Sequence, residues 1–234
     1  MLLRGTLQGH AKAITSSAVY EGILYTTSED GFIKGWDVRC EKAVRSADAK
    51  VPVYSAVVCD GVFFYADYSG FVHRMESLVQ TQVSNCPVSL AESGGELFGY
   101  DKRGRVHQID RKDLSFATVA SMDEGYGLKC IAREEGDSGF LMALASSAGV
   151  GLVRGRDASF SLSFSAPLPE WCWDLAFSGT GEELLFVCSD GSMRSLPLAS
   201  SEASCASEKS GASVVFVADY PLKALRVSRG WGGG

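Results

Sequence analysis

Short apolar runs recur along the chain, and each is followed by a short polar turn. In five places the turn closes with a glycine and a second apolar run begins at once, as in ILYTTSEDG followed by FIKGW. Runs of this length, bounded by Gly, Asp and Ser, predict β-strands joined as hairpins. Tight hairpin turns need positive φ, which glycine adopts at little cost. The five closing glycines are Gly31, Gly70, Gly104, Gly149 and Gly191.

The spacing of these glycines predicts a repeat. They are separated by 39, 34, 45 and 42 residues, and a weaker match ends at Gly230, a further 39 residues on. Most units also begin with their own apolar strand and turn, for example VYSAVVCDG or WDLAFSGTG. Repeats of roughly 40–45 residues with four strands are typical of β-propeller blades. Because no segment holds a helical pattern over three turns, we expect an all-β fold.

The first unit carries a more specific motif. A Gly-His pair at 9–10 precedes its first strand, and Ser-Glu-Asp-Gly at 28–31 leads to Trp-Asp at 36–37. This arrangement resembles the WD-repeat family, in which such pairs bound each blade of a β-propeller. The resemblance implies a buried, hydrogen-bonded tetrad that stabilises the blade, in which every member must be paired. By position, its members are His10, Ser28, Asp30 and Trp36.

The later units depart from this motif. None keeps the Gly-His pair, and only the fifth keeps an acid directly before its turn glycine, at Asp190. The resemblance therefore covers nearly the whole chain as a period, but only about residues 6–40 as a detailed motif. We expect the other blades to be held by apolar packing between neighbouring sheets. The tryptophan position is taken in them by Met75, Ile109, Arg154 and Leu196.

The number of blades has two alternatives. Residues 2–8 suit the strand with which propellers of this family usually close. In one alternative, 213–219 and 222–228 begin a sixth, incomplete blade, whose open edge a partner strand could complete. In the other, 213–219 completes the fifth blade after a long loop at 198–212. The glycine spacing favours six blades in a single domain, at 13–46, 53–83, 88–120, 128–164, 172–207 and, in part, 213–234.

Composition and charge restrict the partners and the compartment. Of the 234 residues, 46% are hydrophobic and 21% are charged, which is ordinary for a globular protein. The net charge of −6 and the scattered Lys and Arg argue against nucleic acid as a direct ligand. No apolar stretch has the length of a signal peptide core or a membrane span. The seven cysteines are widely spread, which is typical of reduced thiols in an intracellular protein, cytoplasmic or nuclear.

Catalytic, metal and cofactor motifs are lacking. The two histidines outside the tetrad, His73 and His107, lie three residues after their turn glycines, where Lys34 and Arg194 lie in other units. A repeat position that accepts His, Lys or Arg indicates a polar strand site. The chain has no H-E-x-x-H, G-x-S-x-G or phosphate-loop motif. We therefore expect no enzymatic activity, no metal and no cofactor.

An aromatic segment at the start of the fifth unit is the candidate for partner binding. Trp171 and Trp173 flank Cys172, and if the cysteine points into the core, alternation sends both indoles the other way. We equate Tyr54 in the second unit and Lys129 in the fourth with Trp173. Exposed aromatics at a concave surface are typical interaction anchors. The hypothesis is a peptide-binding mouth; the alternative is that these side chains only fill space within or between blades.

Three functions are compatible with these features. WD-repeat proteins are mostly scaffolds, so the resemblance implies a protein–protein interaction scaffold in a larger intracellular complex. A hydrolase of the diphthamide-pathway propeller type would need a clustered acid, base or nucleophile, which two spare histidines do not supply. The third function is a structural subunit whose incomplete blade is filled by a partner. We expect protein or peptide partners, with no direct nucleic acid and no membrane.

Overall fold

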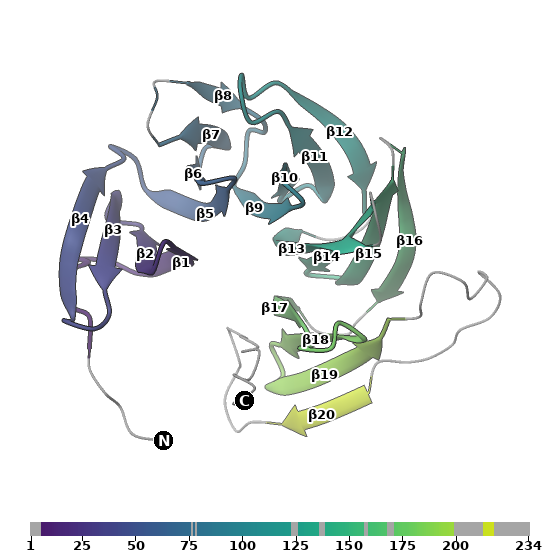
Figure 1. The fold of residues 1–234 in the computed structure, drawn as a ribbon. Coiled ribbons are helices and arrows are strands. Elements are labelled where there is room, and N and C mark those ends of the chain that lie inside the picture. The colour runs from purple at the N-terminus through teal and green to yellow at the C-terminus, as the bar shows by residue number, and fades with distance from the viewer. Residues whose placement is uncertain are drawn as a thin grey trace, which may run out of the picture. The chain divides into compact units, whose positions relative to one another are not determined.

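Among the residues that the computed structural model of the protein describes, twenty strands form five four-stranded antiparallel sheets (Figure 1). In each sheet the strands pair in chain order, so every sheet is a meander of hairpins. The contacts form two compact units, Met1–Lys102 with Val106–Val119 and Arg103–Arg105 with Ala120–Gly234. The single domain expected from the sequence stays a prediction. The structure describes residues 6–75, 77, 79–122, 126–135, 139–156, 159–167, 171–198 and 213–217.

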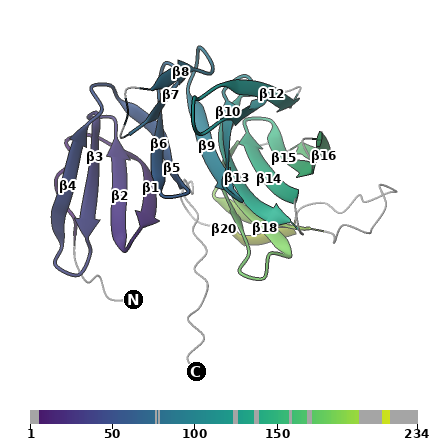
Figure 2. The ribbon, with the colours of Figure 1, turned by 45° about the horizontal axis from the view of Figure 1, so that its top comes forward.

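The first unit holds nearly all of three sheets. The strands of the first sheet, side by side in Figure 2, are β1 (Ile14–Tyr20), β2 (Ile23–Ser28), β3 (Phe32–Asp37) and β4 (Lys42–Asp48). The second sheet consists of β5 (Val53–Cys59), β6 (Val62–Asp67), β7 (Phe71–Arg74) and β8 (Gln80–Gln82). The third consists of β9 (Val88–Ser93), β10 (Glu96–Asp101), β11 (Arg105–Ile109) and β12 (Phe116–Ser121).

Apolar side chains pack between neighbouring sheets of this unit. One buried cluster joins the first sheet to the second and includes Tyr25 and Phe63. A larger cluster joins the second sheet to the third and includes Phe64 and Leu97. Phe63 and Phe64 are adjacent on β6 and enter different clusters, because successive side chains of a strand point to opposite faces. Both faces of the second sheet are therefore buried.

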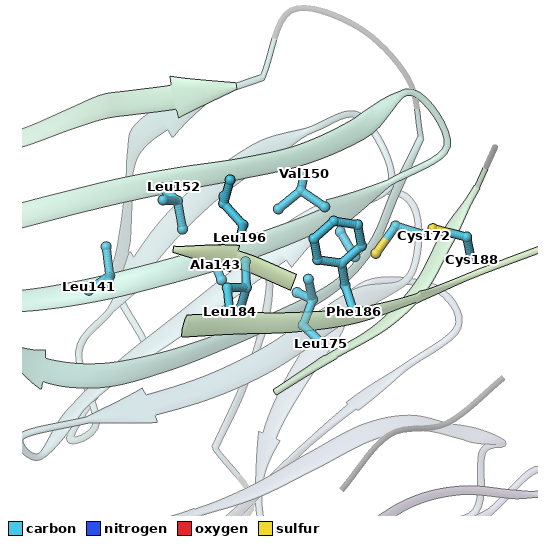
Figure 3. Packing of buried hydrophobic residues seen from close by; sticks show 11 residues of the cluster. Leu141, Ala143, Val150, Leu152, Cys172, Leu175, Leu184, Phe186, Cys188 and Leu196 are labelled. Carbon is cyan, nitrogen blue, oxygen red and sulfur yellow. The ribbon is translucent and has the colours of Figure 1, made fainter. Parts of the chain in front are cut away.

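The second unit holds two sheets with one shared core. The fourth sheet consists of β13 (Gly127–Glu135), β14 (Gly139–Ser146), β15 (Gly149–Arg156) and β16 (Ser159–Pro167). The fifth consists of β17 (Cys172–Phe177), β18 (Glu183–Cys188), β19 (Ser192–Pro197) and β20 (Ser213–Val217). Between them lies a cluster in which Leu141, Leu152, Leu175 and Phe186 meet (Figure 3).

The turn glycines take the backbone conformation that the sequence predicts for four of the five closing positions. Gly70 is the most constrained, with a φ of 83°. A Cβ atom there would lie 2.3 Å from the carbonyl oxygen of Ser84 and 2.6 Å from that of Cys86. Gly149 differs, because its φ of 158° is extended backbone. The fourth hairpin therefore turns without a left-handed glycine at this position.

The last described strand decides between the two blade counts. Ser213–Val217 pairs with β19 and completes the fifth sheet, as the five-blade alternative predicts. The favoured six-blade alternative takes 213–219 as the first strand of a new sheet, and the pairing of residues 213–217 with β19 does not support it. Residues 222–228 and Gly230 lie outside the described residues, as do residues 2–5 of the expected closing strand. The rest of that segment, residues 6–8, is described and forms no strand.

Candidate functional site

A chain of polar side chains fastens the turn between β2 and β3. Trp36 Nε1 donates to Thr26 Oγ1 at 2.7 Å, and His10 Nε2 lies 2.8 Å from the same oxygen. The other ring nitrogen of His10 lies 3.0 Å from a carboxylate oxygen of Asp30. Only 3% of Trp36 is exposed, so the network is buried and each of its members has a hydrogen-bond partner. Such pairing is the condition under which buried polar groups are tolerated.

Asp30 also binds the backbone on both sides of the first hairpin. Its carboxylate accepts the N–H of Ala11 at 2.8 Å and the N–H of Phe32 at 2.9 Å. Burial by itself raises the pKa of Asp30, but these two N–H groups and His10 outweigh it and lower the pKa to about 2. The carboxylate is therefore held in its charged form, and it ties residue 11 to the turn.

Thr26 is the member of this network that sequence reasoning missed. The tetrad implied by the resemblance takes its hydroxyl from Ser28, but Ser28 Oγ instead accepts the N–H of Asp30 at 3.1 Å. Residues 26 and 28 share one face of β2, so alternation alone does not distinguish them. Thr26 differs from Ser28 because the Trp36 ring extends across to β2 and its Nε1 reaches the hydroxyl of Thr26. The stabilising role of His10, Ser28, Asp30 and Trp36 stays a proposal.

The second sheet fastens its turn with an aspartate at the position of Ser28. Asp67 lies three residues before Gly70, and its carboxylate accepts the N–H of Ser69 at 2.8 Å and of Phe71 at 3.1 Å. The other oxygen lies 3.1 Å from His73 Nε2. His73 also stacks on Tyr65, with ring centroids 4.5 Å apart. The strand histidine predicted as a polar site thus lies against a carboxylate in the turn.

The third sheet repeats this arrangement deeper in the protein. Asp101 is 0% exposed and lies 3.4 Å from His107 Nε2. Ser84 Oγ donates to the same carboxylate at 2.9 Å. The second ring nitrogen of His107 lies 3.1 Å from Thr118 Oγ1 on β12. Four polar side chains therefore form one continuous chain, which is buried at Ser84, Asp101 and His107 and reaches the exposed Thr118. Sequence reasoning did not identify it, because Asp101 replaces a serine in the motif.

The fifth sheet uses an arginine at the histidine position. Arg194 donates to Asp190 at 2.8 Å and to Ser192 Oγ at 2.9 Å. Lys34, at the same position in the first sheet, donates to the carbonyl of Gly9 at 2.7 Å. In the second, third and fifth sheets, the basic side chain at this repeat position therefore binds a carboxylate of the turn. In the first sheet, Lys34 binds the segment that precedes β1.

The first strands of four sheets share a register shift near their start. The shifts fall between Ile14 and Ser16, Val53 and Ser55, Gly127 and Lys129, and Cys172 and Asp174. In each case one extra residue is inserted into the ladder, as in a β-bulge. The inserted residues are Thr15, Tyr54, Leu128 and Trp173. Tyr54 is thus equivalent to Trp173 as predicted, but Leu128 and not Lys129 takes that place in the fourth sheet.

The residue that follows each bulge contacts the neighbouring sheet of its own unit. Ser16 Oγ donates to the carbonyl of Ala56 at 3.2 Å, and Ser55 Oγ accepts the N–H of Leu90 at 3.0 Å. In the second unit, Lys129 forms an ion pair with Asp174, whose side chain is 2% exposed. Lys129 therefore neutralises a buried carboxylate, which accounts for a charged residue at this inner position.

The two tryptophans of the predicted site lie at the start of β17. Their ring centroids are 5.4 Å apart with an interplanar angle of 52°. Cys172, between them, is buried in the core cluster, whereas Trp171 is 44% exposed. Tyr126 precedes β13 as Trp171 precedes β17, and it is 65% exposed. Because β13 lies against β17, the second unit presents aromatic side chains at the starts of two neighbouring strands.

Tyr54, the remaining residue of the predicted site, belongs to the first unit. Its ring packs edge-on against Tyr68 with centroids 5.2 Å apart, and Lys102 Nζ lies 5.7 Å from its centroid. Tyr68 donates its hydroxyl to Glu29 at 2.8 Å. Burial and this carboxylate raise the pKa of Tyr68 to about 12. The predicted set is thus divided, with Lys129, Trp171 and Trp173 in one unit and Tyr54 in the other.

In the part of the chain that the structure describes, no group of three or more His, Cys, Asp and Glu side chains is placed to hold a metal ion. No helix within the same residues has the length and apolar character to cross a membrane.

Solved structures supply the comparison that identifies the fold. The WD40 repeats of RRP9 match with a TM-score of 0.66 and 16% identity, over 82% of this chain and 62% of that one. The computationally designed Ika8 protein matches with a TM-score of 0.63 and 18% identity, over 82% of this chain and 60% of its own. The chain thus spans about three-fifths of the length of these structures. No family model and no curated protein matches the sequence. The chain has an all-β fold of the WD-repeat β-propeller type, with five blades among its described residues.

Proposed function

We propose that the protein is a non-catalytic scaffold that binds other proteins or peptides within a larger intracellular complex. The observation that carries this proposal is the exposed aromatic surface at the starts of β13 and β17. Large exposed aromatic side chains are enriched among the residues that dominate binding energy at interfaces. WD-repeat propellers commonly serve as scaffolds, and this analogy of fold adds support of a weaker kind.

The site that we assign to this function is Tyr126, Trp171 and Trp173, backed by Lys129. Trp171 and Tyr126 offer apolar area, with 44% and 65% of their surfaces exposed. Lys129 has a supporting role, because its ammonium group pairs with buried Asp174 and so holds the start of β17 against β13. The partner surface is therefore expected to be mainly apolar. Tyr54, in the first unit, stays a separate proposal for a partner contact.

The chemistry of the three histidines favours binding over catalysis. His10, His73 and His107 each lie within 3.4 Å of an aspartate that also organises a turn or a buried network. A hydrolase of the diphthamide-pathway type would need one of them at an accessible reacting centre. The scattered cysteines favour a reducing compartment, cytoplasmic or nuclear.

Affinity purification of the tagged full chain, followed by mass spectrometry, tests the proposal. We expect Trp171→Ala combined with Trp173→Ala to lose the captured partners by at least tenfold, a change of about 1.4 kcal/mol or more. The matched control is Phe116→Ala, which removes an aromatic ring of similar exposure, 42%, from β12. Thermal unfolding of each variant shows whether the fold is retained. Equal capture by the tryptophan variant and the wild type would exclude this surface as the binding site.

A further inference from the structure

Two cysteines of the fifth sheet lie directly opposite each other. Cys172 begins β17, Cys188 ends β18, and the strand register pairs them. Just outside this pair, the N–H of Ser189 donates to the carbonyl of Trp171 at 2.9 Å. In an antiparallel ladder, hydrogen-bonded and non-hydrogen-bonded pairs alternate, so Cys172 and Cys188 form a non-hydrogen-bonded pair. The Cα atoms of such pairs lie about 4.5 Å apart.

This geometry is suited to a covalent link between the two side chains. Disulfides join residues whose Cα atoms are roughly 4.4–6.8 Å apart and whose side chains point to the same face. Directly opposite residues of a sheet share a face, and both cysteines belong to the cluster between the fourth and fifth sheets (Figure 3). Cys130, on β13, is also buried but stands opposite Leu144.

We propose that Cys172 and Cys188 form a reversible cross-strand disulfide when the chain meets a small-molecule disulfide such as glutathione disulfide. The thiolate of one cysteine attacks a sulfur of the small disulfide and releases one thiol. The thiolate of the second cysteine attacks the protein sulfur of the mixed disulfide and releases the second thiol. The two protein thiols give up two protons and two electrons in total, and the two released thiols take them up.

The closed sheet controls when this reaction occurs. Burial raises the pKa of the Cys172 thiol, and the neighbouring Cys188 and Asp174 raise it further. The thiolate is the nucleophile, so the thiol is inert while β17 and β18 remain paired. Both cysteines lie at strand ends, where local opening costs less than global unfolding. The disulfide therefore forms through transient opening and then locks β17 to β18.

The experiment uses the reduced full chain, incubated with glutathione disulfide and then alkylated for peptide mapping by mass spectrometry. We expect a peptide pair that links Cys172 to Cys188, forms faster in urea below the unfolding transition, and disappears with dithiothreitol. Cys188→Ser should abolish the link, whereas the matched control Cys130→Ser should retain it. The oxidised chain should have an unfolding equilibrium constant lower by roughly a hundredfold, as for a loop of this size.

The wild-type peptide map decides the outcome, so the result does not depend on how well any variant folds. A chain that remains fully reduced in sub-denaturing urea overturns the proposal. So do links between other cysteines or a mixed disulfide that never resolves. The proposal rests on strand register alone and is independent of the scaffold function.

Discussion

The first and third sheets fasten the same turn with the same two residue types, taken from different places in the chain. In the first sheet, His10 precedes β1 and reaches Asp30, 20 positions away. In the third sheet, His107 lies on β11 and reaches Asp101, only six positions away. The first histidine ties an outlying segment to the sheet, whereas the second ties together strands that are already neighbours.

A degenerate motif can keep its physical function. The third sheet has lost the Gly-His pair and the tryptophan, yet its turn carries a fully buried carboxylate with Ser84 and His107 as partners. We expected the later blades to rely on apolar packing alone. That expectation was incomplete. In the second and third sheets, an aspartate three residues before the turn glycine forms a polar network in place of the one in the first sheet.

The largest expected effect is that of Asp101→Ala. It removes the acceptor shared by Ser84 and His107 in a buried site, and we expect it to lower the free energy of unfolding by about 3 kcal/mol. Urea denaturation of the full chain measures this loss. The matched control is Asp113→Ala, at an exposed aspartate that accepts the N–H of Ser115 at 2.8 Å; the control should lower the free energy of unfolding far less than Asp101→Ala does. Equal losses would show that the buried network of the third sheet contributes little.

An intermediate effect is expected when the Thr26 hydroxyl of the first sheet is removed. Thr26→Val should cost about 2 kcal/mol because it leaves both His10 and Trp36 without their shared partner, whereas Ser28→Ala should cost about 1 kcal/mol. A double-mutant cycle with Trp36→Phe should give a coupling energy of roughly 1 kcal/mol for the pair with Thr26. Coupling to Ser28 that is as large would contradict the assignment of Thr26.

The smallest expected effect concerns the pH dependence of the first sheet. The pKa of Asp30 is about 2 in the folded chain, below the ordinary value of 3.8. Its contribution to stability is therefore complete above the ordinary pKa and is lost as the pH falls toward 2, by roughly 1 kcal/mol after allowance for solvent screening. Denaturation of wild type and Asp30→Asn at pH 5 and pH 3 measures it. A loss of the same size in both proteins would assign the effect to other carboxylates.

Much of the fold could be predicted because its signals are local. The strands that end at Ser28, Asp67 and Cys188 were recognisable from apolar runs and from glycines at the turns. Tyr54 and Trp173 were correctly equated, because each directly follows the first residue of its unit's first strand. Lys129 was misplaced by one residue, since the bulge in β13 shifts the ladder without changing the composition of the strand.

The candidate site was less predictable, for a related reason. Asp101 and Thr118 both contact His107 only because β10, β11 and β12 pair side by side. In the sequence alone, Lys129 has no evident partner. Its ion pair with Asp174 forms only because β17 lies against β13. Neither contact has a local signature, because each depends on which strand becomes the neighbour.

By itself, the sequence determined the all-β class, the repeat and the positions of the turns, because alternation and glycine conformation act over a few residues. The tertiary structure alone decided that Ser213–Val217 completes the fifth sheet, that Thr26 joins His10 to Trp36, and that Cys172 faces Cys188. Each of these depends on register between strands, and register is set by how whole sheets bury their faces.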